Sequence, residues 1–382
     1  MTSTIIVEKA PHLRRKDSLA RMLIDVLIAL APTAVFAVVV YGFDAVRNLG
    51  VSWATMVLAE FVFVLIQNRI KYDGAKHSFK EQIKAGVSGY SVNNLLAPSI
   101  SAVIFALIMP ARLDPYYLIY PALIAGSLFG IVIGKLVFGG NGSNIFNPAA
   151  VGMVFAKLCF GSHYVYNSRS FYVTTGGTPL TNAITEVSGL NSLTGKWTGI
   201  ESVPLANLFF GQVGGTIGEA FKITILIGMA YLLIRKAADW RIIASYLGTF
   251  IVVMSLAGAI ICTRENLSFF RFLAFQLLSG GMLFGLAFML TDPVTSPINS
   301  PSRFIYGAFA AAVTCIIRLF GALPEGMVYS ILLGNLIAPA LDYYKWSSSR
   351  WNRRYAIILC CVIGVALLAT GLGLGFGGEV VA

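Results

Sequence analysis

Gly139-Gly-Asn-Gly-Ser-Asn-Ile-Phe-Asn-Pro-Ala-Ala-Val-Gly152 is a glycine-rich turn that leads into an apolar segment. Its centre, Asn144-Ile-Phe-Asn-Pro148, matches the pattern N-[LI]-x-x-P, which recurs as Asn94-Leu-Leu-Ala-Pro98 and as Asn335-Leu-Ile-Ala-Pro339. Proline removes one backbone donor from a helix, and an asparagine side chain can bond the groups that a helix break exposes. We therefore predict broken helices at the three copies. The alternative is that the pattern recurs by chance in proline-kinked helices.

The chain around this turn is almost continuously apolar. Of its 382 residues, 57% are hydrophobic and 12% are charged, and the mean hydropathy is +0.77. Soluble domains carry about 25% charged residues, so this composition indicates a polytopic membrane protein. The first 20 residues contain no apolar stretch that ends in a small-residue cleavage site, so we predict no removable signal peptide. Residues 1–20 are expected to form a cytoplasmic N-terminal segment.

The number of membrane-spanning helices follows from the lengths of the apolar segments. A helix needs about 20 mostly apolar residues to cross the hydrocarbon. We therefore predict an all-α protein with about 10–11 transmembrane helices, and the segments near residues 91, 145 and 327 are expected to be broken or re-entrant. The segments are 19–42, 49–67, 91–109, 117–138, 145–160, 215–234, 242–262, 272–290, 304–320, 327–342 and 355–377.

The recurring pattern also predicts the domain organisation. The copies at Asn144 and Asn335 fall in the fifth and tenth apolar segments. An offset of five spans relates two halves of a chain by inverted topology, as in many transporters. We predict a first five-helix repeat at 21–160, an extracytoplasmic loop at 161–213 and a second repeat at 214–342. Residues 343–382 are expected to form a basic cytoplasmic loop and an extra C-terminal helix.

Orientation follows from the basic residues. If every segment crosses the membrane, most of the 28 Lys and Arg residues lie on the same side as residue 1. This bias is the positive-inside pattern, so we predict a cytoplasmic N-terminus and an extracytoplasmic 161–213 loop. The net charge of +11 then needs no nucleic-acid partner, because the basic residues lie in short loops at membrane ends rather than on one soluble face.

Metal ligands are not indicated. The five cysteines lie within or beside apolar segments without C-x-x-C spacing, and the three histidines are scattered in loops. Clustered thiolates or imidazoles are what zinc and iron–sulfur sites require. We therefore predict no metal site and interpret the cysteines as small apolar packing residues.

Three acidic residues lie in or at the ends of apolar segments. Asp25 is in the first, Glu60 is in the second, and Asp342 ends the tenth. A carboxylate at membrane depth is costly, so each is a candidate for an ion pathway. The alternative is that they cap helices or pair with nearby bases. For Asp25, four residues from Arg21, pairing is the favoured interpretation.

Several polar stretches, taken in order, carry a family resemblance. They are the 139–152 turn, Val173-Thr-Thr-Gly-Gly-Thr-Pro-Leu180, Phe288-Met-Leu-Thr-Asp-Pro-Val-Thr-Ser-Pro297 and Leu323-Pro-Glu-Gly326. With them, the chain resembles the NqrB/RnfD family of flavin-bearing membrane subunits from Pro11-His-Leu-Arg14 to about residue 342. It is more similar to RnfD, because Pro11-His-Leu-Arg14 lies directly before the first span and the long N-terminal extension of NqrB is missing.

The resemblance implies a covalent cofactor. Family members carry FMN by a phosphoester to the last threonine of an [ST]-G-A-T element, installed by a flavin transferase. Thr175, Gly176 and Thr178 match this element, so Thr178 is the expected attachment residue. Gly177 stands where alanine is usual, and Tyr172 stands where the transferase signature has aspartate. From its residues alone, an ordinary exposed loop is the favoured interpretation of the tract.

The resemblance further implies a second, non-covalent flavin such as riboflavin inside the bundle. Its expected neighbours lie at two of the polar breaks and are Asn144, Asn147, Asp292 and Thr295. The residues themselves do not distinguish riboflavin from a quinone or from a packed core. Glu60 and Asp342 also match intramembrane acids of the family.

The function that the resemblance implies is electron relay in an Rnf-type ferredoxin:NAD oxidoreductase complex that translocates Na⁺ or H⁺. The chain is then a multi-pass protein of the prokaryotic cytoplasmic membrane, not catalytic alone, with the Rnf subunits A, B, C, E and G as partners. One alternative is an NqrB-type component of the Na⁺-translocating NADH:quinone reductase. Alternatives of other classes are a urea-transporter-like solute channel, which the repeat architecture alone would permit, and a structural membrane anchor.

Overall fold

The protein is described here from a computed structural model. Its described residues are almost all helical, with one two-stranded antiparallel sheet in which β1 (Arg112–Leu113) pairs with β2 (Tyr164–Val165). The described residues are 19–68, 79–140, 142–165, 197–200, 203–211, 213–219, 221–321, 325–343 and 350–377.

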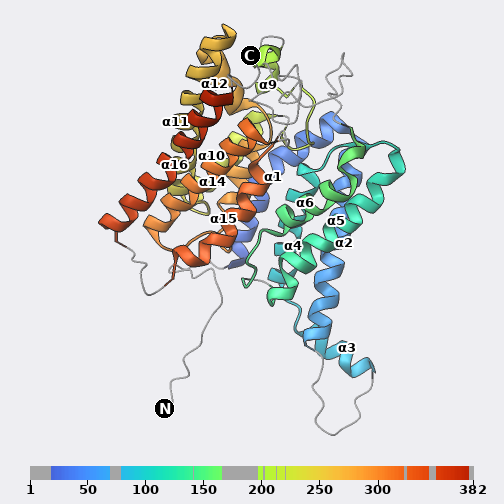
Figure 1. The fold of residues 1–382 in the computed structure, drawn as a ribbon. Helices are drawn as coiled ribbons and strands as arrows, with labels where there is room; N and C mark the ends of the chain where they lie inside the picture. The colour runs from blue at the N-terminus through green and yellow to red at the C-terminus, as the bar shows by residue number, and fades with distance from the viewer. Residues whose placement is uncertain are drawn as a thin grey trace.

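The first half of the chain forms one group of helices, blue to green in Figure 1. The tight connection between its first two helices runs through Gly42, whose φ of 57° is the left-handed conformation that glycine adopts without strain. Its elements are α1 (Leu19–Tyr41), α2 (Phe43–Gln67), α3 (Phe79–Ser88), α4 (Val92–Ile108), η1 (Tyr116–Leu118), α5 (Ile119–Gly134), η2 (Leu136–Phe138) and α6 (Pro148–Phe160).

The second half forms a neighbouring group, yellow to red in Figure 1. Short elements connect it to α6, namely η3 (Gly161–His163), η4 (Trp197–Ile200) and α9 (Leu205–Phe209). Its main elements are α10 (Lys222–Arg235), α11 (Trp240–Glu265), α12 (Phe269–Leu278), α13 (Met282–Gly285), the π-helical turn η5 (Leu286–Leu290), α14 (Ser300–Phe320), α15 (Met327–Leu341) and α16 (Arg353–Gly377).

The prediction of a polytopic helical membrane protein is confirmed. In the described part of the chain, six helices are long and apolar enough to cross a membrane, or up to eight if each of two bent helix pairs is one span. Every predicted segment contains a helix, but α6, α10 and α15 have only 13, 14 and 15 residues. At 1.5 Å per residue they are shorter than the hydrocarbon thickness of about 30 Å. The described residues therefore supply six to eight candidate crossings by length, and the remaining predicted segments are short helices.

The breaks do not all lie at the prolines where we expected them. The first bent pair, α3 and α4, turns by 77° ahead of Val92, whereas Pro98 lies inside α4. Pro98 cannot donate to the carbonyl of Asn94, four residues earlier, but the Tyr90 hydroxyl donates to that carbonyl at 3.4 Å. The helix therefore continues past Pro98. The break that Pro148 predicts is confirmed, because α6 begins at that residue. The break predicted at the third copy is wrong, because α15 runs without interruption from Met327 to Leu341 with Pro339 inside it.

The order of elements repeats between the halves. Each half contains two helices, then a bent pair, then a long helix and a short one: α1 to α6, and α10 to α15. The second bent pair, α12 with α13, turns by 52° near Gly280, which has a φ of 68°. Helices α1 and α10 pack together, as do α6 and α15, so the halves meet along these elements. That the repeats are inverted relative to one another stays a prediction.

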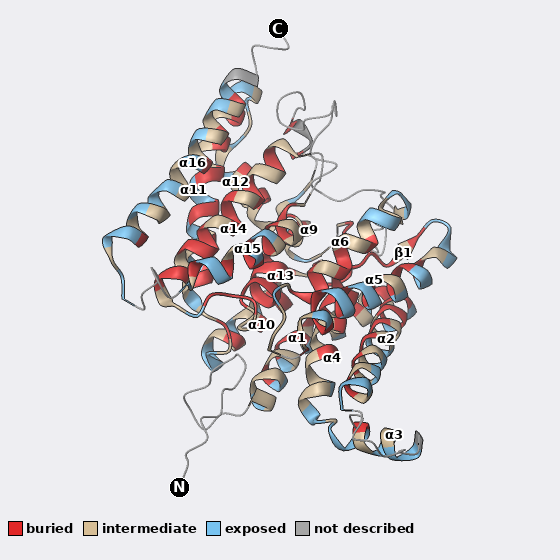
Figure 2. Cartoon of the chain, turned by 60° about the horizontal axis from the view of Figure 1, so that its bottom comes forward, coloured by how far each residue is buried: buried red, intermediate tan, exposed pale blue. Residues whose placement is uncertain are grey.

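The outer surfaces of the long helices are apolar, as lipid requires. Val35 and Val39 on α1, Leu58 on α2, and Val365 and Leu368 on α16 are all more than half exposed. Figure 2 shows the buried residues in the centre of the helix groups and the exposed ones along their outer faces. The extra C-terminal helix α16 packs against α11 and α14. Its remaining apolar surface is suited to hydrocarbon.

Candidate functional site

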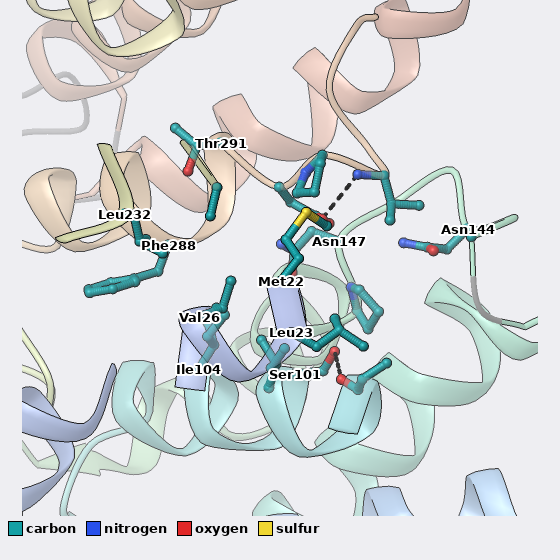
Figure 3. A pocket seen from close by; sticks show the side chains of 18 of the residues that line it. Met22, Leu23, Val26, Ser101, Ile104, Asn144, Asn147, Leu232, Phe288 and Thr291 are labelled. Carbon is teal, nitrogen blue, oxygen red and sulfur yellow. Dashed lines mark hydrogen bonds between the residues drawn. The ribbon is translucent and has the colours of Figure 1, made fainter. Parts of the chain in front are cut away.

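A cavity of about 100 Å³ lies between the two halves of the chain (Figure 3). Its walls come from α1, α4 and α10, and from the η5 turn, and its polar side is formed by the segments that precede α6 and α14. Met22, Val26, Ile104, Leu232 and Phe288 make the walls apolar. The cavity therefore brings together residues that are far apart in the sequence.

The polar side of the cavity is formed first by the turn before α6. Gly139, Gly140 and Gly142 all have positive φ, so this turn depends on glycine. The Asn144 side chain donates to the carbonyl of Phe146 at 3.3 Å and lines the cavity.

Asn147 caps α6. Its side-chain oxygen accepts from the N–H groups of Ala149 and Ala150 at 3.0 and 3.3 Å, and its backbone carbonyl accepts from Val151. Pro148 has no N–H, so no first-turn donor of α6 is left for a ligand. The N–H groups at the start of α6 are thus satisfied by Asn147 itself.

A buried chain of hydrogen bonds connects Asn147 to the second half. The backbone N–H of Asn147 donates to the side-chain oxygen of Asn335 at 3.0 Å. The Asn335 amide donates in turn to the hydroxyl of Tyr306 at 2.9 Å and to the carbonyl of Thr295 at 3.4 Å. Asn335 is fully buried, so these bonds satisfy groups that water does not reach.

Asp292 completes the polar side from the segment before α14. It accepts a hydrogen bond from the Val294 N–H and another from the Thr295 hydroxyl, both at 3.2 Å. Burial raises the pKa of Asp292 above its ordinary value, and these two bonds together with the Lys135 charge act in the opposite direction. Asn144, Asn147 and Asp292 all line the cavity. That they bind a cofactor stays a prediction. Thr295 lies behind Asp292 and holds its carboxylate.

The cavity wall also contains a buried ion pair that sequence reasoning found only in part. Glu60 of α2 lies 3.0 Å from the ammonium group of Lys135, and their side chains are 2% and 3% exposed. Lys135 lines the cavity, so the pair connects the α2 carboxylate to this site. We singled out Glu60 but not Lys135. A lone lysine at the end of an apolar segment was the available signal.

The other predicted ion-pathway acids lie elsewhere. Asp25 accepts from the Tyr231 hydroxyl at 3.0 Å and pairs with Arg235 of α10 at 3.2 Å, which joins α1 to α10. Asp342 follows the last turn of α15 and accepts from the backbone N–H groups of Ile298 and Asn299. Neither residue lines the cavity between the halves. Both positions show the helix-end or pairing role that was the alternative interpretation.

The expected attachment residue, Thr178, lies outside the described residues, as do Thr175, Gly176 and Gly177. Within the described ranges there is no group of three or more His, Cys, Asp or Glu side chains placed to hold a metal ion.

The side chains of the cavity fit a planar heterocycle. Apolar walls on several sides with a few polar groups at one edge are the usual composition of a cofactor pocket. Asn144 supplies an amide at that edge and Asp292 supplies a carboxylate. These groups could bond ring carbonyls and ring N–H groups, and Met22 and Val26 would form part of the apolar wall beside such a ring.

Comparison with known proteins gives consistent results. A family model described as the NQR2, RnfD, RnfE family matches residues 6–349. The chain is 31% identical to the D subunit of the Na⁺-translocating ferredoxin:NAD⁺ oxidoreductase complex of Acetobacterium woodii, over 89% of this chain and 93% of that protein. It is 28% identical to the D subunit of the proton-translocating ferredoxin:NAD⁺ oxidoreductase complex of Clostridium ljungdahlii, over 91% of this chain and 96% of that protein. It is 32% identical to the B subunit of the Na⁺-translocating NADH-quinone reductase of Chromohalobacter salexigens, over 77% of this chain and 68% of that protein.

Proposed function

The chain belongs to the NQR2, RnfD, RnfE family, and on this premise we propose that it is the flavin-carrying membrane component of an Rnf-type complex. In this role it relays electrons and helps to couple ferredoxin:NAD⁺ chemistry to ion translocation, together with the Rnf subunits A, B, C, E and G. Length favours the Rnf assignment over the NqrB-type alternative. The alignment covers 93% and 96% of the two relatives from ferredoxin:NAD⁺ oxidoreductase complexes, against 58–88% of the relatives from the quinone reductase.

The observation that carries the proposal is the cavity between the halves. Its apolar walls and its Asn144 and Asp292 edge suit a flavin ring better than a path for a polar solute, because Met22, Val26, Ile104, Leu232 and Phe288 offer no hydrogen bonds. A flavin supplies one- and two-electron redox chemistry when bound. The chain positions it, excludes water with the apolar side chains, and places the Asp292 carboxylate at its polar edge.

The covalent cofactor is the second part of the proposal. We infer that FMN is attached to Thr178 by a flavin transferase, within the tract that includes Thr175, Gly176 and Gly177. The motif match and the family membership support this inference. The tract follows β2 and precedes α9 in a region of the chain that contains no predicted apolar span.

The test is in-gel flavin fluorescence of denatured protein coexpressed with its transferase. We expect a fluorescent band for the unaltered chain and none for Thr178→Ala. Thr181→Ala, three residues further on, is the matched control and should keep the band. A band that survives in Thr178→Ala would put the bond on another residue. Absence of any flavin absorbance in the native complex would overturn the proposed function and favour the solute-channel alternative.

A further inference from the structure

The short helix α3 lies across the end of α2, outside the packed centre of the first helix group (Figure 1). It has ten residues, so it is about 15 Å long and too short to cross the hydrocarbon. It meets α4 at an angle of 77°, and α4 packs along α1 and α2, which are long enough to span a membrane. The axis of α3 therefore runs closer to the membrane plane than to the direction of these spans.

Two contacts hold α3 against the end of α2. A methyl group built on Gly86 would lie 2.7 Å from Cδ2 and 3.0 Å from Cα of Leu65, so only glycine permits this approach. Directly after α3, the ring of Tyr90 packs edge-on against Phe61, with 5.4 Å between the ring centroids. The position of α3 is thus determined by packing on α2.

The contact with α2 also determines the depth of α3. With 25 residues, α2 is about 37 Å long, whereas the hydrocarbon is about 30 Å thick, so the ends of α2 extend into the headgroup layer. Leu65 belongs to the last turn of α2, which ends at Gln67. Val62 and Ile66 are 45% and 59% exposed, so the lipid-facing surface of α2 continues to this level. We infer that α3 lies in the headgroup layer.

One side of α3 is a mixed basic and apolar face, formed by Lys80, Ile83, Lys84 and Val87. These residues are spaced i, i+3, i+4 and i+7, which places them on one side of a helix. All four are exposed, and α3 is largely exposed in Figure 2. Gly86 lies about a quarter turn around the helix from the centre of this face. The contact with α2 therefore leaves the Lys80 face free.

The charge around α3 is complementary to an anionic surface. Residues 69–84 contain five basic residues and two acidic ones, Asp73 and Glu81. A lysine stem covers apolar surface while its ammonium group reaches outward, which suits a layer with phosphates beside acyl chains. Ile83 and Val87 supply the apolar part of the same face. This combination is typical of helices that lie in a membrane interface.

The size of the Lys80 face argues against a protein partner. A helix about 15 Å long and about 10 Å wide offers about 150 Å² on one side. A stable protein interface buries about 800 Å² on each partner. A lipid surface needs no such area, because the spans already hold the chain in the membrane.

We propose that α3 is an interfacial helix that binds the phosphates of anionic phospholipids through Lys80 and Lys84. Ile83 and Val87 enter the boundary between headgroups and acyl chains. Each lysine close to an anionic surface strengthens the association by about fivefold, and the effect decreases within a Debye length. The bound lipid holds the connection between α2 and α4 at the membrane surface.

The first experiment places the photoreactive amino acid p-benzoylphenylalanine at position 83 of the full-length chain in nanodiscs of mixed phosphatidylcholine and phosphatidylglycerol. We expect a phospholipid adduct that is enriched in phosphatidylglycerol by about tenfold or more over its share of the lipid. Lys80→Gln/Lys84→Gln should abolish the enrichment. Lys236→Gln, which removes an exposed charge at the end of α10, should preserve it. The same probe in place of Leu58, which is 62% exposed on α2, should give an adduct without enrichment.

Two outcomes of irradiation overturn the proposal. One is an adduct between position 83 and another polypeptide in native membranes that contain the whole complex, because it assigns the face to a protein partner. The other is the absence of a lipid adduct at position 83 when position 58 reacts.

Amide hydrogen exchange of residues 80–88 gives an independent measurement without a probe. In the unaltered chain, exchange should be about fivefold or more slower in phosphatidylglycerol than in phosphatidylcholine nanodiscs. In Lys80→Gln/Lys84→Gln, the two rates should be equal, while exchange in α11 shows that the variant is folded. Equal rates in the unaltered chain would contradict the proposal.

Discussion

The backbone N–H of Asn147 donates to the side-chain oxygen of Asn335 at 3.0 Å, although the two residues are 188 positions apart in the chain. Asn147 caps α6 and Asn335 lies in α15, the corresponding short helices of the two halves. Both residues belong to copies of the pattern that first indicated a repeat. The bond therefore connects the halves at equivalent elements, directly beside the larger cavity.

Removing the Asn335 side chain should destabilise the junction between the halves. In Asn335→Ala, the N–H of Asn147 and the hydroxyl of Tyr306 lose their partners in a dry interior. We expect a loss of about 2–4 kcal/mol in the free energy of unfolding, since each buried unsatisfied group costs about 1–3 kcal/mol. Asn352→Ala, which removes the half-buried cap of α16, should cost about 1 kcal/mol or less. Thermal unfolding of the two variants compares them, and equal effects would contradict the prediction.

The Glu60–Lys135 pair should tolerate removal of both charges better than removal of one. Glu60→Gln leaves the Lys135 ammonium group buried without its counter-charge, and Lys135→Met leaves the Glu60 carboxylate in the same state. For Lys135→Met we expect the free energy of unfolding to fall by about 3–5 kcal/mol. The double variant Glu60→Leu/Lys135→Met should recover most of this lost stability. Arg264→Gln breaks the more exposed 3.8 Å pair with Glu265 and should cost below about 1 kcal/mol.

The same variants test the ion pathway. If Glu60 takes part in ion transfer, the double variant folds but its complex pumps fewer ions per electron. Ion uptake by proteoliposomes that contain the complex provides this ratio. A Glu60→Gln complex that pumps with normal stoichiometry would remove Glu60 from the pathway.

The contact between α5 and α6 should depend on Gly130. A methyl group there would lie 2.5 Å from the carbonyl oxygen of Pro148 and 3.0 Å from the Cα of Gly152. Because this is backbone, Gly130→Ala should cost about 1–3 kcal/mol through displacement of α6. At Gly50, in α2, the same methyl group meets nothing within 4 Å. Gly50→Ala should therefore raise the stability by up to about 1 kcal/mol. Thermal unfolding measures both variants, and we expect their stability changes to have opposite signs.

Filling the larger cavity should displace a non-covalent flavin but leave the covalent one. Val26 lines the cavity from α1, so Val26→Trp places a bulky ring in the space. We expect the flavin released by acid extraction to fall to near zero while the fluorescent Thr178 band persists. Val35→Trp is the matched control, because Val35 is on the same helix and is 63% exposed. Equal extractable flavin in both variants would place the second flavin elsewhere.

The positions of the membrane helices were predictable because insertion into lipid is a local property. A run of about 20 apolar residues becomes a helix wherever it lies in the chain, since lipid offers no partner for backbone groups. All predicted segments accordingly contain helices. The helix α3 was missed because its residues are polar enough to look like a loop. The helix α10 was predicted too long because apolar residues precede it without helical structure.

The site was predictable only where polar residues interrupt an apolar run. Asn144, Asn147 and Asp292 stood out for this reason, and they do meet at one cavity. Lys135 did not, because one base at the end of a span has an ordinary explanation as an anchor at the membrane surface. Lys80 and Lys84 counted only toward the basic bias between the two sides of the membrane, because their common face exists only once residues 79–88 form a helix.

By itself, the amino-acid sequence determined that this protein is helical, lies in a membrane and belongs to a two-part architecture, because hydropathy, segment length and recurring Asn–Pro pairs are properties of neighbouring residues. Only the tertiary structure decided which charges are paired and which oxygens face a cavity. The partners of Asp25, Glu60 and Asn147 lie on other helices, and burial determines whether such a group is bonded or available to a ligand.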